Sequence, residues 1–553
     1  MRIVTTRGRP ALVFGLALAL MLTGPGAAAV ARAADQVKTD EGKFLIYMGE
    51  TQIGTEEFRL DEKGAFSVVE LSFMGTTSRA EVSLYGRPGA WTSYKLAAGP
   101  QTITAAIGER EVTVEVVGLK KTLTFDGPPT VVESNIFYHY QLMLDAYDRA
   151  AGGTQCQEVL IPSAMSSGEA TIEIVGPVAE GTPIPLTEFR IVVTKVFGLT
   201  AFVDADGRMV ELQFPAQQLR VVREDYDALA RAHAQARKAE SSAQGLPYTE
   251  EEFVVKNGDI ELAGTLTIPA EGTGPYPAVF LNSGSGPQDR DGNTPPVFMT
   301  YMFRHMAERY ASAGIAVMRY DERGVGKSTG SNEAALLSDL IGDVEALIAY
   351  LKAHPSIDRS RIVVLGHSEG GYIAPAVAAA DPEIAGCIVI AGASTPLDQI
   401  MVEQVEYQAS HEELDERSRA LAASTMPMVK QLIQDAKDGK ETSVVPSFNL
   451  DWLREHMIHD PIATIQKVRV PVLIIQGDKD LKVKPYHADV LGMALREAGN
   501  PDVTVVHLPM IGHEMMAWPY NNPDFDPHNP TKVPDEVYNT IGDWMVERLV
   551  TGR

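Results

Sequence analysis

The residues best suited to chemistry lie in the run RIVVLGHSEGGYIAPAVAAA, residues 361–380. An apolar, β-branched segment leads into GHSEG, and an alanine-rich segment typical of a helix follows. A serine in a tight turn between a strand and a helix exposes its hydroxyl, and flanking glycines let neighbouring backbone approach closely. The pattern predicts that Ser368, between Gly366 and Gly370, is a nucleophile. A helix-capping serine is the structural alternative.

A serine nucleophile needs a base to take its proton and an acid to orient that base. Two candidates follow Ser368 along the chain: Asp480 ends the segment VPVLIIQGDKD, and His513 follows VTVVHLPMIG. Because parallel sheets place their sites beyond the carboxyl ends of their strands, the order serine, aspartate, histidine predicts a catalytic triad. Asp478 is the weaker candidate for the acid, since Gly477 and Asp478 have the composition of a turn.

A glycine-rich segment upstream offers backbone donors for the oxyanion that forms when a carbonyl is attacked. YPAVFLNSGSGPQDRDG reads as a strand followed by a loop of small residues. We expect the backbone N–H groups of Ser285 and Glu369 to form the oxyanion hole, although a plain turn also explains the loop. A second glycine-rich turn, GVGKSTG, does not have the spacing of a phosphate-binding loop, because Gly324 precedes Gly326 by only two positions.

Residues 250–550 resemble a serine hydrolase of the α/β-hydrolase superfamily, through NSGSGPQDRDG, YDERGVGKS, GHSEGGYIAP, GDKD and GH in that order. SGSGPQDRDG together with GHSEGG is most similar to bacterial EstD-type carboxylesterases, a group related to the prolyl-oligopeptidase and dienelactone-hydrolase branches. The resemblance implies an acyl hydrolase that needs no metal and no cofactor, acts on a small-molecule ester, and carries its triad at Ser368, Asp480 and His513. It covers a little over half of the chain and does not identify the substrate.

The elements that must position this site belong to the α/β class and occupy residues 248–553. We expect a mostly parallel α/β-hydrolase sheet with a helical lid inserted at about 394–468. Residues 36–222 differ, because short alternating segments between Gly, Asp and Pro turns predict a β-rich domain, a sandwich or half-barrel, with a helix at 135–151. Residues 223–247 read as a helix and a linker. Both a substrate-positioning role and a structural or dimerisation role remain open for the β-rich domain.

Residues 1–33 have the pattern of a secretory signal peptide. A basic start precedes the apolar stretch from Ala11 to Leu22, and the small residues of ARA at 31–33 suit a cleavage site. An uncleaved anchor is the alternative, but the stretch is shorter than the about 20 residues that a membrane span needs. We therefore expect a periplasmic or secreted bacterial protein with no stable membrane insertion after cleavage.

The composition limits the partners of the chain. Its formal net charge is −25, and removal of residues 1–33, with four arginines and no acids, changes it to −29. A protein this acidic is repelled by nucleic acids and by anionic membranes, so we expect no nucleic-acid partner. The two cysteines, Cys156 and Cys387, fall in different predicted domains, which argues against a disulfide between them. A homo-oligomer is compatible with the sequence.

Three functional classes are compatible with these motifs. The favoured one is an exported carboxylic-ester hydrolase that works through an acyl-enzyme. A serine peptidase or amidase would use the same triad but needs acidic groups to hold the substrate amine, and Glu369 has no evident acidic partner in the sequence. A binding protein built on an inactive hydrolase scaffold is disfavoured by the complete triad. Hydrolases with an aspartate nucleophile are disfavoured because Ser368 occupies that position.

Overall fold

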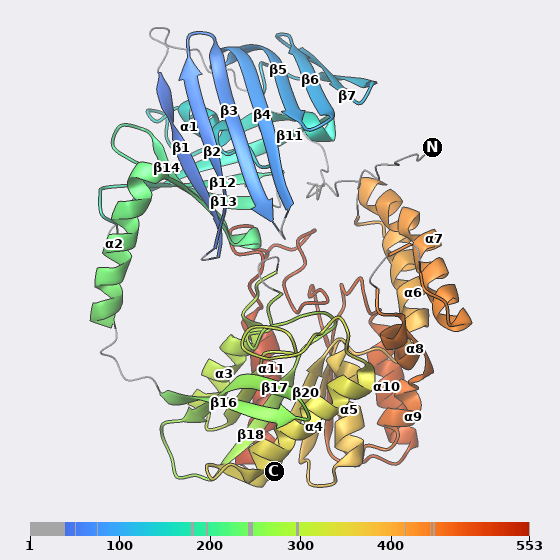
Figure 1. Cartoon of the computed structure of the whole chain (residues 1–553). Coiled ribbons are helices and arrows are strands. Elements are labelled where there is room, and N and C mark those ends of the chain that lie inside the picture. The colour runs from blue at the N-terminus through green and yellow to red at the C-terminus, as the bar shows by residue number, and fades with distance from the viewer. Residues whose placement is uncertain are drawn as a thin grey trace, which may run out of the picture. The chain divides into compact units, whose positions relative to one another are not determined.

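The computed structural model describes residues 39–551, except 50, 74–75, 179–181, 195–196, 242–246, 295–297, 415, 443 and 446–447. The signal peptide predicted for residues 1–33 lies outside the described residues. The described chain divides into two compact units (Figure 1). The first runs to Phe214 and includes Leu219–Ala239, and the second comprises Pro215–Gln218 and the chain from Glu240 onward. Within the described part of the chain, no helix combines the length and apolar character that a membrane crossing requires.

One sheet makes up most of the first unit. Its described strands follow the order β8-β7-β6-β5-β4-β3-β2-β1-β15-β14-β13-β12-β11-β10-β9. Neighbours are antiparallel, except that β9 and β10 are parallel. The strands are β1 Asp40–Met48, β2 Thr51–Asp61, β3 Gly64–Phe73, β4 Thr76–Arg87, β5 Ala90–Ala98, β6 Gln101–Ile107, β7 Glu111–Val116, β8 Leu119–Thr124, β9 Thr130–Val131, β10 Thr154–Ile161, β11 Ser166–Pro177, β12 Thr187–Val193, β13 Phe197–Val203, β14 Met209–Phe214 and β15 Leu219–Arg223.

The core of this unit surrounds the helix α1 (Tyr138–Asp145). Buried side chains from both halves of the sheet and from α1 form one apolar cluster, so the sheet curves around the helix. The buried carboxylate of Glu56, in β2, accepts the first N–H groups of the helix, 2.8 Å from Phe137 N and 3.1 Å from Tyr138 N. The predicted β-rich domain is confirmed. Its helix is shorter than the predicted 135–151, because Asn135 has a positive φ of 64° and the chain turns after Asp145.

The second unit is built on a sheet with the order β16-β17-β19-β18-β20-β21-β22-β23 among the described residues. The neighbours from β19 to β23 are parallel, whereas β16 and β17 form an antiparallel hairpin and β17 pairs antiparallel with β19. The strands are β16 Tyr248–Asn257, β17 Ile260–Pro269, β18 Tyr276–Asn282, β19 Ala316–Tyr320, β20 Ile357–His367, β21 Gly386–Ile390, β22 Val472–Gly477 and β23 Val503–Leu508. The helix α2 (Glu224–Ser241) lies before this sheet in the chain.

Helices cover both faces of this sheet (Figure 1). Successive residues of a strand point to opposite faces, so Ile362 and Val364 of β20 pack with the helices of one face, and Val363 and Leu365 with those of the other. The helices on the first face are α4 Leu337–Ala353, α5 Gly370–Ala380 and α10 Tyr486–Glu497. Those on the second face are α3 Met302–Ser312 and α11 Asp535–Met545. This arrangement confirms the predicted α/β class.

A helical insertion separates β21 from β22, as the sequence predicts. It contains α6 Leu397–Ser410, α7 Glu416–Asp438, α8 Leu450–Ile458 and α9 Pro461–Ile465. Polar contacts join α6 to the chain after β22, where Glu403 lies 2.7 Å from the Nε2 of His487 and Gln408 donates to the carbonyl of Leu481. Helix α8 contacts the start of α4, where Glu455 accepts from the backbone and the hydroxyl of Ser338. The insertion is therefore held to the sheet domain on two sides.

We predict that a fragment of residues 248–553 will fold alone and hydrolyse small activated esters. It contains all the described strands of the second sheet and all three predicted triad residues, and its two largest apolar clusters are formed within it. Circular dichroism, a cooperative unfolding curve and p-nitrophenyl acetate turnover test this. A fragment that folds but is inactive would mean that the β-rich unit completes the site.

Candidate active site

The turn between β20 and α5 holds Ser368 in the left-handed region, with φ of 55°. This conformation is costly for a residue with a side chain, and the backbone N–H of Ser368 stabilises it by donating to the carbonyl of Ile390 at 2.8 Å. A Cβ on Gly366 would overlap the carbonyl of Gly370, and one on Gly370 would lie 2.7 Å from the carbonyl oxygen of Ser283. Only glycine fits on either side of the serine, as the motif predicts.

The structure brings Ser368, His513 and Asp480 together in a line of hydrogen bonds. The Nε2 of His513 is 2.9 Å from the Oγ of Ser368, and its Nδ1 is 2.8 Å from the Oδ2 of Asp480. Asp480 is fully buried, and its other oxygen accepts the backbone N–H groups of Lys482 and Val483 at 2.7 and 2.8 Å. The carboxylate can accept only from Nδ1–H, which leaves Nε2 as the acceptor for the serine proton.

Asp478 has a different role from its neighbour two residues later. Its side chain is exposed, and its Oδ1 accepts the backbone N–H of Met510 at 2.7 Å. Met510 has a positive φ of 56° and lies in the loop that carries His513. The turn composition suggests that Asp478 bonds to amides of its own loop, whereas the structure shows a bridge to the histidine loop.

Two further side chains hold the triad, and the sequence analysis does not identify them. The ring of His367 is buried, and its Nε2 lies 2.9 Å from the carbonyl oxygen of His513, to which it donates. Burial lowers the pKa of His367 to about 4, so the ring stays neutral. Gln476, also buried, donates to the Oδ2 of Asp480 at 2.8 Å. The only sequence signal for His367 is its place within GHSEG, and for Gln476 its place near the end of a strand.

The loop after β18 lies against the nucleophile. A Cβ built on Gly284 would be 3.0 Å from the Cβ of Ser368, so the absence of a side chain lets this loop approach the serine. Ser285 follows in that loop, and Glu369 follows the serine at the start of α5, where the helix dipole favours negative charge. Among the described residues, neither the N–H of Ser285 nor that of Glu369 donates to a protein acceptor. Both remain available for an oxyanion.

The side chain of Glu369 is taken up by the lid. Its Oε1 accepts from the indole Nε1 of Trp452 at 2.8 Å, and the Nε2 of His456 lies 2.7 Å from the same oxygen, off the line of a hydrogen bond. Both partners belong to α8, and both Glu369 and His456 are buried. The lid is thus tied to the residue that follows the nucleophile.

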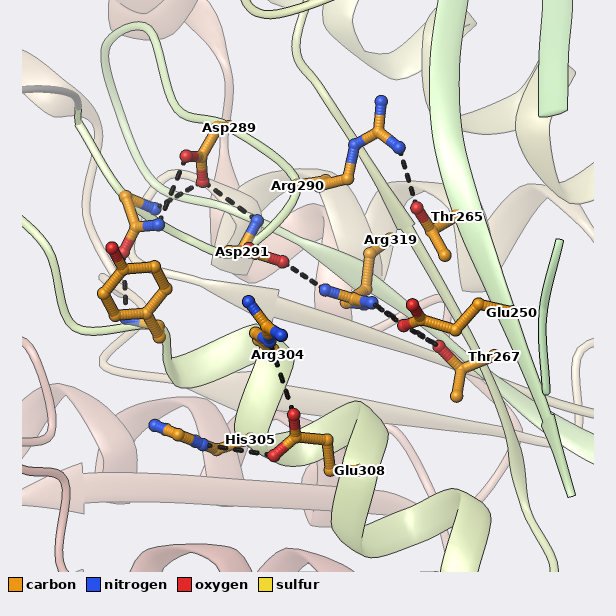
Figure 2. A network of polar contacts seen from close by, with 12 residues as sticks. Glu250, Thr265, Thr267, Asp289, Arg290, Asp291, Arg304, His305, Glu308 and Arg319 are labelled. Atoms are coloured by element: carbon orange, nitrogen blue, oxygen red, sulfur yellow. Dashed lines mark hydrogen bonds and ion pairs between the residues drawn. The ribbon is translucent and has the colours of Figure 1, made fainter. Parts of the chain in front are cut away.

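A network of charges fixes the far end of the loop after β18. Figure 2 shows Arg319 of β19 between Asp291 of the loop and Glu250 of β16. The guanidinium of Arg319 lies 2.8 Å from the carboxylate of Glu250. Arg290 of the same loop pairs with Asp321 at 2.8 Å and with Glu252 at 2.7 Å. The loop is therefore braced against the β16–β17 hairpin and the end of β19.

This geometry agrees with comparisons to known proteins. The family model described as "Serine aminopeptidase, S33" matches residues 300–517. The esterase EstD of Thermotoga maritima is 28% identical over 302 residues, which cover 54% of this chain and 68% of EstD. The α/β hydrolase domain-containing protein WAV2 of Arabidopsis thaliana is 27% identical over 199 residues, 35% of this chain and 53% of WAV2.

The second unit has the α/β-hydrolase fold. The sheet order, the serine at the β20–α5 turn and the match to EstD agree on this, and the resemblance to EstD-type carboxylesterases is confirmed. Among solved structures, Est1E of Butyrivibrio proteoclasticus, determined with ferulic acid bound, has 17% identity and a TM-score of 0.36, and the alignment covers 53% of this chain and 98% of Est1E. The family-model match at residues 300–517 lies wholly within the second unit.

Proposed function

We propose that the protein is a serine esterase that hydrolyses carboxylic esters through an acyl-enzyme, with Ser368, His513 and Asp480 as its triad. One observation carries the proposal: the hydroxyl of Ser368 is 2.9 Å from a histidine nitrogen whose ring is oriented by a buried carboxylate at 2.8 Å. The relationship to a protein named as an esterase supports the same chemistry. No step of this mechanism requires a metal or a cofactor.

The chain's own residues account for each step. His513 takes the proton of Ser368 as the oxygen attacks the ester carbonyl, and Asp480 stabilises the imidazolium that forms. The N–H groups of Ser285 and Glu369 receive the negative charge of the tetrahedral intermediate. His513 then gives its proton to the departing alcohol, which leaves the acyl-enzyme. Water then takes the place of the serine hydroxyl, and the same groups hydrolyse the acyl-enzyme and release the acid.

The surroundings of Glu369 favour esters over peptides with a free amino terminus. A peptidase of that kind needs a carboxylate free to bind the substrate amine. The carboxylate next to the nucleophile instead receives Trp452 and approaches His456. An ester has no ammonium group to bind, so ester hydrolysis does not need the carboxylate of Glu369 to be free.

A panel of chromogenic substrates tests the proposal. Purified protein should turn over p-nitrophenyl esters of short to medium acyl chains, with kcat/KM at least about a hundredfold above that for aminoacyl p-nitroanilides, since peptidase action requires a free carboxylate for the substrate amine and that of Glu369 is engaged. A preference for the anilides would assign the protein to the peptidases.

We also propose that the protein is exported, on the basis of the basic and apolar pattern of residues 1–33. The mature chain should then begin near Ala34 and be recovered from the periplasm or the medium. N-terminal sequencing of the exported protein checks this, and recovery of Met1 from a membrane fraction would indicate an uncleaved anchor instead.

A further inference from the structure

A buried carboxyl group lies beneath the loop that carries the predicted oxyanion donor Ser285. It belongs to Glu322, two residues after β19, and its side chain is only 5% exposed. One carboxyl oxygen is 2.5 Å from the hydroxyl of Ser283, and the other accepts the backbone N–H of Gln288 at 3.2 Å. The amide of Asn332 donates to that second oxygen at 3.0 Å. Glu322 therefore binds both ends of the short segment that contains Ser285.

The same segment contacts the nucleophile turn. The carbonyl of Ser283 accepts the N–H of Gly370 at 3.1 Å, and Gly284 lies against Ser368. A shift of Ser283 would therefore move both the loop donor and the first residue of α5. The carboxyl of Glu322 is therefore linked through Ser283 to the first residue of α5 and to the loop that lies against Ser368.

Glu322 has no basic partner among the described residues. The charged groups facing it are the carboxylates of Glu369 and Asp343, while Arg323 is committed to Asp343 at 2.7 Å. The hydroxyl of Tyr320 donates to Asn282 rather than to Glu322. Burial, reinforced by Glu369 and Asp343, raises the pKa of Glu322 to about 8, although the hydrogen bond from Ser283 opposes it. At neutral pH the raised pKa favours the neutral acid, which shares a hydrogen bond with the hydroxyl of Ser283 and accepts from Gln288 and Asn332.

We propose that Glu322 is a positioning residue of the hydrolase site, which holds Ser283 and Gln288 so that the N–H of Ser285 faces the oxyanion. This rests on the proposed serine esterase function. The neutral acid keeps negative charge away from the oxyanion hole, and ionisation would place a carboxylate beneath it. The cost of that charge falls on the transition state, since the substrate carbonyl carries no full charge before attack.

Three variants separate this role from general stability. Glu322→Ala should lower kcat for p-nitrophenyl acetate by about 10²-fold with KM within about threefold, comparable to the loss of one oxyanion donor. Glu322→Gln keeps an acceptor for Gln288 and a donor for Ser283, so its kcat at pH 7 should stay within about fivefold of the wild type. The matched control is Glu133→Gln in the β-rich unit, where a buried glutamate is likewise 2.5 Å from a serine hydroxyl, that of Ser163, and should leave kcat unchanged.

The pH profile provides a readout that a purely structural role would not change. In the wild type kcat should fall as pH rises through about 8, because Glu322 ionises. Glu322→Gln has no proton to lose and should keep its kcat to about pH 9.5, whereas Glu133→Gln should show the wild-type decline. The same ionisation affects stability. Because the pKa of Glu322 is raised in the folded state, the wild type loses stability as pH rises from the pKa of an unfolded glutamate toward 8. Glu322→Gln lacks this loss, so its stability relative to the wild type should be greater at pH 9 than at pH 5.

Each outcome decides the proposal. A folded Glu322→Ala variant with kcat within threefold of the wild type, or an unchanged alkaline decline in Glu322→Gln, would overturn it. If Glu322→Ala does not fold, Ser283→Ala cuts the same link with a smaller change, and its kcat should fall about tenfold at constant KM; an unaffected kcat would overturn the proposal. A wild type that neither turns over esters nor reacts with a fluorophosphonate would refute the esterase function itself, whereas a reactive wild type with unaffected variants would refute only the role of Glu322.

Discussion

Ser368→Ala will abolish ester turnover and leave the protein folded. Removal of the nucleophile from a serine hydrolase costs about 10⁴ to 10⁶ in kcat. The serine is half-buried, and among the described residues its side chain bonds only to His513, so the change to alanine opens no large cavity. The positive φ at this position remains, because the turn around it is set by Gly366 and Gly370. Steady-state kinetics with p-nitrophenyl esters and an unchanged unfolding curve check the result.

Ser285→Ala is the matched control for this experiment. Ser285 is exposed, and only its backbone N–H is assigned a role, so its alanine variant should keep kcat within about threefold. A fluorophosphonate should label the wild type on the peptide that contains Ser368, as read by mass spectrometry, and should not label Ser368→Ala. Label on Ser283 or Ser285 would reverse the assignment of the nucleophile.

Asp480→Asn will lower kcat by about 10² to 10⁴, whereas Asp478→Asn will cost less than about tenfold. The asparagine at 480 keeps the shape of the side chain but removes the charge that stabilises the imidazolium, and its amide can hold His513 in the wrong tautomer. Asp478 makes no contact with the imidazole, and an asparagine oxygen can still accept the N–H of Met510.

The comparison requires both variants to be folded, which circular dichroism establishes before the kinetics. Asp480 is fully buried, and its carboxylate accepts backbone N–H groups. For Asp480→Asn we expect kcat to be lower at every pH while the unfolding transition stays normal. The reverse ranking of the two variants would move the acid to Asp478. Equal small losses would mean that His513 does not depend on either carboxylate.

The positions of Ser368, Asp480 and His513 are readable from the sequence because each follows an apolar strand. Parallel pairing brings the carboxyl ends of such strands to one edge, so chain order alone indicates that the three side chains meet. Nothing comparable marks His367, Gln476 or Glu322. His367 and Glu322 act through contacts between segments distant in the chain, and a single sequence does not encode which loops will touch. Gln476 contacts Asp480 only four residues away, but the turn that brings the two side chains together is not marked by their types.

The β-rich unit is predictable in class but not in detail. Alternating apolar residues indicate strands, yet the pair of β1 with β15 in the middle of the sheet joins Phe44 to Arg223, which no local pattern indicates. The helix α1 is predicted too long because helix-compatible residues continue beyond Asp145, whereas the helix ends there with Ala146 as its C-cap. For the lid, helical periodicity predicts the helices, but the bond from Trp452 to Glu369 depends on tertiary packing.

The distance along the chain between the two reacting side chains has a consequence for biosynthesis. Ser368 and His513 are 145 positions apart, with the whole lid between them. Such a pair can meet only after a large loop closes, and contacts of this kind form slowly compared with local ones. A chain held unfolded by a secretion pathway would therefore carry every reactive group and still be unable to cleave the esters of the cell that makes it. Hydrolysis would begin only where the chain folds.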